Sequence, residues 1–217
     1  NFRHLARFMD YYDRLGQVDA ILADLGVSSH HFDAMERGFS FRDETPLLDM
    51  RMNNRAGLSA RDLLNSYEEE QLADVLYRYG ELKQSRSLAK LIVKARSVAP
   101  LQTVGDLIAA LRPALRPDQE KKLLACIFQA LRIEVNGELK ALEELLEASL
   151  RVLRPGGRLV VMTYHSLEDR IVKNFLKGTD DSAEAQIYGT ARSAWRLVTR
   201  KPLVASAEEL ERNPRSR

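Results

Sequence analysis

The order of hydrophobic and polar positions predicts a mixed α/β protein. Apolar residues recur at helical spacing over residues 3–14, and after Gly16 the short apolar run Val18–Leu25 is typical of a buried strand. A second strand is expected at Arg158–Tyr164, with a helix over residues 167–177 directly behind it. A helix, a tight turn and an apolar strand in succession favour an α/β unit with a parallel sheet.

The chain between these strands follows the helical period almost throughout. Ser66 with Glu69, and Thr103, are the expected N-caps of two of its helices. Gly156-Gly157 is expected to form the turn from the last helix into the second strand, while residues 195–206 favour a strand or a hairpin. Helices are expected from Ser59 and over residues 66–80, 84–98, 104–112, 118–135 and 136–153. We therefore expect one α/β sheet interrupted by a helical insertion.

Composition narrows the class of protein. The 217 residues are 45% apolar and 29% charged, with a net charge of +2, which disfavours a protein that coats polyanions. The single Cys126 excludes an internal disulfide, and with only four histidines it argues against a metal site. Since no apolar run approaches about 18 residues and no basic-then-apolar signal precedes the first helix, we expect a cytoplasmic protein without a membrane partner. The chain opens on Asn1 rather than Met, which suggests a fragment.

Reactive side chains gather after both predicted strands. Ligands of open α/β sheets bind beyond the carboxyl ends of the strands, so two parallel neighbours would share one such rim. The alternative is structural: Gly26 supplies a tight turn, and Ser166 with Asp169 caps a helix. A G-x-S-x-G elbow, a P-loop and a G-x-G-x-x-G are all absent, which disfavours a hydrolase or a nucleotide-binding loop. The clusters are Asp24, Ser28, Ser29, His30 and His31, and then His165, Ser166, Glu168, Asp169 and Arg170.

Basic residues mixed with aromatic residues suggest contact with RNA. The segments RGFSFR (37–42) and MRM (50–52) combine cations with rings and thioethers, which suits base stacking and phosphate contact. A solvated loop packed by its phenylalanines is the alternative. Arg170 and Lys173 lie one helical turn apart and, with Arg132, would form a phosphate-binding face, against the alternative of ordinary surface charge.

Six motifs in order resemble the bacterial 16S ribosomal RNA cytosine-N4 methyltransferase family, RsmH or MraW. The resemblance runs across essentially the whole chain, and the combination of GFSFR, LDMRM and HSLEDR is highly specific. The motifs are DLGVSS (24–29), ERGFSFR (36–42), LDMRM (48–52), FQALRIEVN (128–136), RPGGRLVVMTYHSLEDRIVK (154–173) and TRKP (199–202).

The resemblance implies a class I, Rossmann-like, S-adenosylmethionine-dependent methyltransferase sheet with an inserted all-helical domain. Residues 1–52 and 130–217 would form the α/β domain, with Val18–Leu25 and Arg158–Tyr164 as its fourth and fifth strands. Residues 53–129 would form the RNA-recognition insertion. The family's Gly-rich loop after strand one and its acidic residue after strand two have no counterpart here, so we expect the first strands of the sheet to be absent.

The implied reaction is methyl transfer from S-adenosyl-L-methionine to the exocyclic N4 amine of a cytidine in the decoding region of 16S rRNA. The 30S ribosomal subunit would be the partner, and a homodimer stays open. Asp24 and carbonyls of the 25–29 turn would accept from the amine, and His165 would take up the proton. Two alternatives remain: a fragment that lacks cofactor affinity and only binds RNA or the ribosome, and an unrelated small-molecule methyltransferase. The implied residues are Asp24, Ser28 and His165 for catalysis; Phe2, Asp24 and His31 for the cofactor; and Arg42, Arg51, Arg132, Asn136, Arg170 and Lys173 for RNA.

Overall fold

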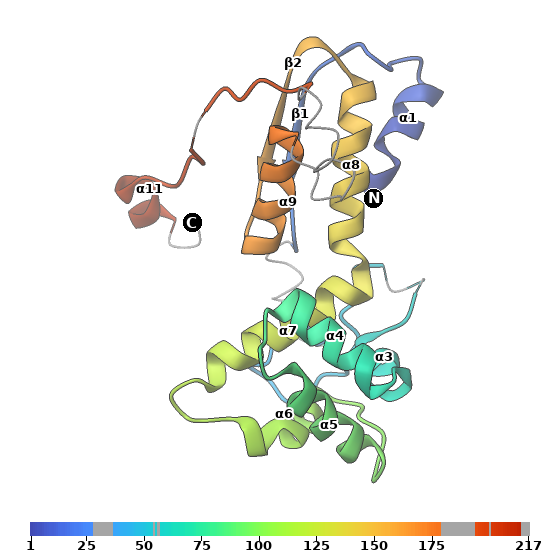
Figure 1. The fold of residues 1–217 in the computed structure, drawn as a ribbon, viewed down its shortest axis with the longest axis vertical. Coiled ribbons are helices and arrows are strands. Elements are labelled where there is room, and N and C mark those ends of the chain that lie inside the picture. Colours follow the sequence, from blue (N-terminus) through green and yellow to red (C-terminus); the bar gives the residue numbers. More distant parts are fainter. Residues whose placement is uncertain (28–36, 54, 56, 179–193, 200, 214–217) are drawn as a thin grey trace, which may run out of the picture. The chain divides into compact units, whose positions relative to one another are not determined.

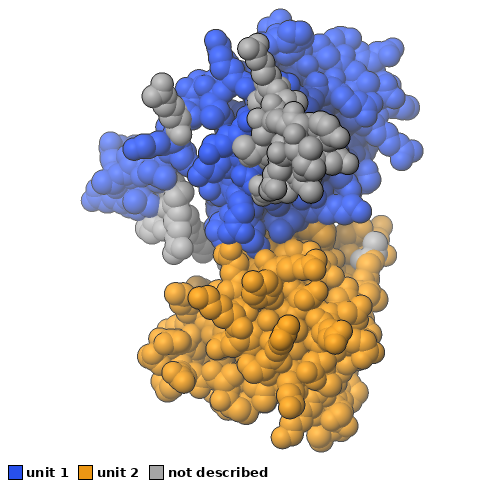
Figure 2. Space-filling model, in the orientation of Figure 1, with its two compact units in different colours: residues 1–26, 139–217 blue, residues 27–138 orange. Residues whose placement is uncertain are grey.

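The computed structural model describes residues 1–27, 37–53, 55, 57–178, 194–199 and 201–213. The chain divides into two compact units, shown in different colours in Figure 2. Residues 1–26 and 139–217 form the first, which we call the sheet unit. Residues 27–138 form the second, which we call the helical unit. The boundaries between the two units therefore lie between residues 26 and 27 and between residues 138 and 139.

The sheet unit is built on two parallel strands, β1 (Val18–Asp24) and β2 (Leu153–Met162). Asp24 pairs with Met162, and the Leu25 amide donates to the Met162 carbonyl at 3.3 Å. The predicted parallel pairing is thus confirmed. The other elements of this unit are η1 (Phe2–His4), α1 (Leu5–Tyr11), α8 (Glu138–Val152, whose first residue belongs to the helical unit), α9 (Ser166–Lys177) and α11 (Ala207–Arg212).

The glycine pair Gly156-Gly157 lies inside β2, so the prediction of a turn before that strand is wrong. The strand begins at Leu153, directly after α8, and its register against β1 shifts between Val18 and Ala20. Gly156 has φ +82°, a conformation that side chains with a Cβ rarely adopt. A Cβ on Gly157 would lie 2.9 Å from the Arg154 carbonyl oxygen. The two glycines therefore permit the irregularity within the strand. Gly156 adopts the left-handed conformation, and Gly157 allows the backbone to approach closely.

One face of the strand pair is covered by helices. α8 and α9 lie beside the strands (Figure 1), and their apolar side chains pack with alternate strand residues. The intervening strand side chains stay open, so Leu22, Val160 and Met162 are 69%, 51% and 46% exposed. This alternation defines an open face to which Asp24 also belongs, two positions after Leu22. The packed residues are Ala23, Leu25, Leu142, Leu145 and Leu146, with Leu5, Leu159, Val161, Ile171, Val172 and Phe175 partly buried against them.

The helical unit has its own core. Most of its leucines and isoleucines at helical spacing are buried, as the amphipathic pattern predicts, and each fully buried one contributes roughly 1.5–3 kcal/mol. Leu48 and Met50, from the segment before the first of these helices, are 0% exposed in the same core. The elements are α3 (Ala60–Ser66), α4 (Glu69–Gly80), α5 (Ser85–Arg96), α6 (Val104–Leu111), η3 (Arg112–Ala114) and α7 (Glu120–Asn136).

The helix caps test local signals in the sequence. Thr103 caps α6, and the carboxylate of Asp106 accepts from the Thr103 amide at 2.8 Å, which confirms that cap. The capping box expected at Ser66 is wrong, because Ser66 is the last residue of α3. Glu68 is the N-cap of α4, and its amide donates to the Gln71 side chain at 2.9 Å. The same four-residue spacing recurs two positions further along the chain.

The C-terminal part differs from the prediction. The described residues of 195–206 form no strand. Residues Ala207–Arg212 form helix α11, which the sequence analysis missed, and the Ser206 hydroxyl accepts from the Glu209 amide at 3.1 Å as its N-cap. Within the described residues, no helix combines the length and apolar character needed to cross a membrane.

Candidate functional site

Asp24 and Tyr164 join the two strand ends on the open face. The Tyr164 hydroxyl donates to Asp24 Oδ1 at 2.7 Å, across 140 positions of sequence. Asp24 ends β1 and pairs with Met162, and Tyr164 follows Met162 by two residues, so it continues the same side of the strand. Tyr164 is 57% exposed. Asp24 and Tyr164, at the ends of β1 and β2, thus lie at one rim of the strand pair.

Glu168 holds the second strand end from inside the protein. It lies in the first turn of α9 and is 3% exposed. Its Oε2 accepts from the Tyr164 amide at 2.8 Å, and its Oε1 lies 3.3 Å from His165 Nε2. The carboxylate therefore contacts the backbone that carries Tyr164 and the ring that follows it.

His165 caps helix α9, so the alternative in which Ser166 and Asp169 form a capping box there is wrong. Its Nδ1 accepts from the Glu168 amide at 3.5 Å, while Ser166 is the first helical residue. A neutral ring that accepts at Nδ1 carries its proton on Nε2, the nitrogen that faces Glu168. Only 10% of the His165 side chain is exposed. The predicted proton acceptor is thus largely buried, with Nδ1 used as the helix cap and Nε2 3.3 Å from a carboxylate oxygen.

Tyr164 remains a hydrogen-bond donor at neutral pH. The hydrogen bond to Asp24, followed by burial and by the charges of Asp24 and Glu168, raises the pKa of its phenol. Sequence analysis missed this residue because a tyrosine at a strand end is usually packing. The sequence did contain a signal: every second residue of a strand faces the same side, so Tyr164 follows Val160 and Met162 on the side where Asp24 ends β1.

Asn136 and Arg51, both expected to contact RNA, make contacts within the helical unit. Asn136 Nδ2 donates to the Met50 carbonyl at 2.8 Å, and its Oδ1 accepts from the Met52 amide at 2.7 Å. Arg51 binds Asp49 through Nε and a terminal nitrogen at 2.9 and 2.8 Å. The Arg51 hydrogen bond lowers the pKa of the Asp49 carboxyl. The LDMRM motif is therefore a loop held by its own side chains and by helix α7.

Arg132 is paired as well. It forms two hydrogen bonds to the Glu138 carboxylate, at 2.9 and 3.1 Å, and the two side chains are 14% and 9% exposed. Arg42, Arg170 and Lys173 are exposed, the last two on α9. Arg132 would have to leave Glu138 before it could bind a phosphate.

Phe2, the predicted contact of the cofactor, lies in the first helical turn of the chain. Phe2 begins η1 and is 40% exposed, and Arg3 beside it pairs with Glu144 of α8 at 3.4 Å. Ser28 and His31 lie outside the described residues.

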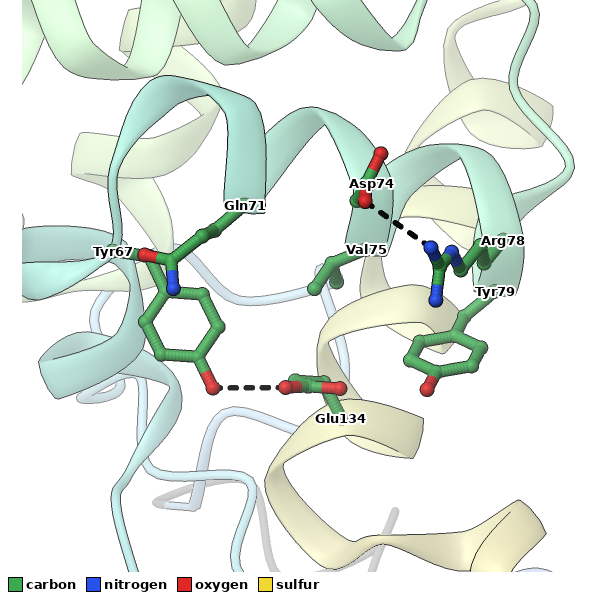
Figure 3. A pocket seen from close by; sticks show the side chains of 7 residues that line it. All are labelled: Tyr67, Gln71, Asp74, Val75, Arg78, Tyr79 and Glu134. Carbon is green, nitrogen blue, oxygen red and sulfur yellow. Dashed lines mark hydrogen bonds and ion pairs between the residues drawn. The ribbon is translucent and has the colours of Figure 1, made fainter.

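The helical unit carries an open pocket of about 250 Å³ that the sequence analysis did not anticipate. Figure 3 shows the rings of Tyr67 and Tyr79 on either side of the Glu134 carboxylate. The Tyr67 hydroxyl donates to Glu134 at 2.8 Å, and burial together with this bond raises the pKa of Tyr67 to about 12. Asp74 and Arg78, at 3.3 Å, close another side.

The fold and the rim define a mixed α/β protein with a polar site at the carboxyl ends of parallel strands. The model of the MraW methylase family matches residues 1–217, and the chain belongs to this family.

Curated relatives agree along the whole chain. A protein of Porphyromonas gingivalis is 62% identical over 223 residues, which cover the entire chain and 71% of the relative. Proteins of Parabacteroides distasonis and Bacteroides thetaiotaomicron are 59% and 57% identical, again over the entire chain, and it spans 72% and 71% of their lengths. Each of these relatives is named ribosomal RNA small subunit methyltransferase H.

Proposed function

We propose that this protein transfers a methyl group from S-adenosylmethionine to the exocyclic N4 amine of a cytidine in the decoding region of small-subunit ribosomal RNA. The observation that carries the proposal is the 62% identity, over the entire chain, to a ribosomal RNA small subunit methyltransferase H. The 16S rRNA or the 30S subunit, in the cytoplasm, would be the substrate.

The proposed fold is a class I, Rossmann-like methyltransferase domain that contains β1 and β2. The Asp24 carboxylate is exposed at the carboxyl end of β1, where ligands of such sheets bind, and an anionic group there suits a sulfonium cofactor. The ring of Phe2, 40% exposed, offers a face for adenine. The residues proposed to recognise RNA, 53–129, belong to the helical unit, which spans residues 27–138.

The residues of the rim would act mainly by position. When bound, S-adenosylmethionine supplies an electrophilic methyl group on its sulfonium. The lone pair of the target amine is conjugated with the ring of the base, so Asp24 would accept from an amine N–H and favour the more pyramidal, more nucleophilic nitrogen of the transition state. His165 is proposed to take the proton that the nitrogen loses. Because its Nδ1 accepts from the Glu168 amide, the ring would first have to leave the N-cap of α9. Ser28 and His31 remain predicted contacts of the adjoining turn.

RNA contact is proposed for the predicted cations. Arg42, Arg170 and Lys173 are exposed and can meet phosphates directly. Arg51, Arg132 and Asn136 would contribute through the shape of the loop and helix that they hold. Substitution of the exposed cations should weaken RNA binding and reduce its dependence on salt.

The test is the transfer of labelled methyl groups to small subunits that lack the modification, with the modified base mapped by mass spectrometry. Asp24→Ala should abolish transfer while RNA binding stays measurable. Asp19→Ala is the matched control, since Asp19 is an exposed carboxylate of the same strand that pairs with Arg154. Full turnover by Asp24→Ala would refute the role of Asp24. A calorimetric titration with S-adenosylmethionine separates an enzyme from a module that only binds RNA, because the latter would show no cofactor binding.

A further inference from the structure

We infer that Tyr164 is a positioning residue for methyl transfer: its hydroxyl holds the Asp24 carboxylate so that one oxygen faces the amine of the target base. The inference rests on the proposed function, and it adds a residue to which neither the family nor the names of the relatives assign a role. Its basis is the 2.7 Å hydrogen bond from the Tyr164 hydroxyl to Asp24 Oδ1.

Asp24 needs such a partner because of its place in the fold. It is the last residue of β1 and is exposed, so packing does not select one side-chain rotamer. A carboxylate has two acceptor oxygens, and donation by Tyr164 to Oδ1 directs Oδ2 to another donor. Both N–H groups of an exocyclic amine are suitable donors. A fixed acceptor raises the rate because it need not be ordered during the reaction.

Tyr164 is itself fixed at two points. Its amide donates to Glu168 Oε2 at 2.8 Å, and this carboxylate is 3% exposed at the start of α9. Its ring lies close to Gly26, where a Cβ would be 3.6 Å from Tyr164 Cδ2. The hydroxyl thus extends from a backbone held by a buried anion, and one edge of the ring lies near Gly26.

The Tyr164 hydroxyl supplies its proton over the whole physiological range, because the pKa of the phenol is raised. Tyr164 therefore stays protonated and keeps donating to Asp24 near neutral pH. The arrangement therefore serves orientation rather than a pH switch, and the effect of Tyr164 on the reaction should pass through Asp24 alone.

Tyr164→Phe keeps the ring and removes only the hydroxyl. We expect kcat for methyl transfer to small subunits to fall roughly tenfold to a hundredfold, the loss typical of a misplaced reactive group. KM for RNA and for the cofactor should change less than about twofold, and the melting temperature should not change. Tyr11→Phe is the control, since Tyr11 is 81% exposed in α1. A fall carried by the KM for RNA would overturn the inference, because it would indicate direct substrate contact.

A double-mutant cycle separates action through Asp24 from an independent role. In single-turnover assays, Tyr164→Phe added to Asp24→Asn should cost no further activity. An additive loss would overturn the inference. Should Asp24→Asn show no measurable turnover, tyrosine NMR with a ¹³Cζ label gives the second readout: Asp24→Asn should lower the pKa of Tyr164, and an unchanged pKa would overturn the inference.

The outcomes also separate this inference from the proposed function. An unmodified protein that transfers no methyl group to small-subunit RNA overturns both. An active protein in which Tyr164→Phe is equally active overturns the positioning role of Tyr164 and leaves the proposed function intact.

Discussion

Asn136 in the last turn of α7 is bound to Met50, 86 positions earlier in the chain, by a 2.8 Å hydrogen bond from its side-chain nitrogen to the Met50 carbonyl. The same amide group accepts from the Met52 amide at 2.7 Å. Met50 is 0% exposed and has φ +56°, a strained conformation for a residue with a Cβ. Helix α7 thus holds the LDMRM loop through hydrogen bonds at Met50, where the backbone is strained, and at Met52.

Asn136→Ala should destabilise the protein by about 2 kcal/mol, because it leaves partly buried backbone groups of residues 50 and 52 without their partner. Urea unfolding measures the change. Asn136→Asp is the matched variant, since it keeps the acceptor for the Met52 amide and loses the donor to Met50. Its free energy of unfolding should lie between those of the unmodified protein and Asn136→Ala. A direct RNA contact would instead lower RNA affinity in Asn136→Ala with no change in the urea midpoint.

The Arg132–Glu138 pair should behave as a buried ion pair. Arg132→Met leaves a carboxylate that is 9% exposed without its two hydrogen bonds, which costs about 3 kcal/mol. Adding Glu138→Met should restore a large part of that loss, because the second change removes the uncompensated charge. The four unfolding free energies form the measurement. Additive losses in the double variant would show that the two side chains act separately.

Local signals in the sequence carried much of the fold. The Thr103 cap and the helices of the middle region depend on contacts within about four residues, and apolar periodicity gives the core faces directly. The parallel pairing of β1 and β2 followed from the order of the elements. Their rim followed from the rule that ligands bind at carboxyl ends.

The errors lie where distant segments decide. Gly156-Gly157 has the composition of a turn, but both residues belong to β2, which pairs with β1. Asn136 carries no local sign that its amide group reaches Met50 and Met52, so these two contacts could not be predicted from the sequence. Tyr164 was missed for the same reason, because its partner Asp24 is 140 positions away.

Asp106 should make the protein less stable in acid. Hydrogen bonds from the Thr103 and Gln102 amides lower the pKa of its carboxyl below the ordinary 3.8. A carboxyl with a lowered pKa in the folded state stabilises fully above its unfolded pKa, and this contribution is lost as the pH falls through the folded one. Melting temperatures between pH 6 and pH 2.5 should therefore fall less steeply for Asp106→Asn than for the unmodified protein. Asp74→Asn, an exposed control on α4, should keep the original slope.

The Tyr67 phenol should affect the stability of the protein at alkaline pH. Burial, and then its 2.8 Å hydrogen bond to Glu134, raise the pKa of its phenol to about 12. A phenol with a raised pKa contributes stability fully below its ordinary pKa of 10, and that contribution is lost as the pH rises through about 12. Absorbance at 295 nm, compared between the unmodified protein and Tyr67→Phe, should isolate one tyrosine that ionises late. Glu134→Gln should bring this ionisation to lower pH without reaching 10, because burial remains. If the high-pH ionisation is unchanged in Glu134→Gln, the hydrogen bond to Glu134 does not raise the pKa of Tyr67. If it persists in Tyr67→Phe, the tyrosine that ionises at high pH is not Tyr67.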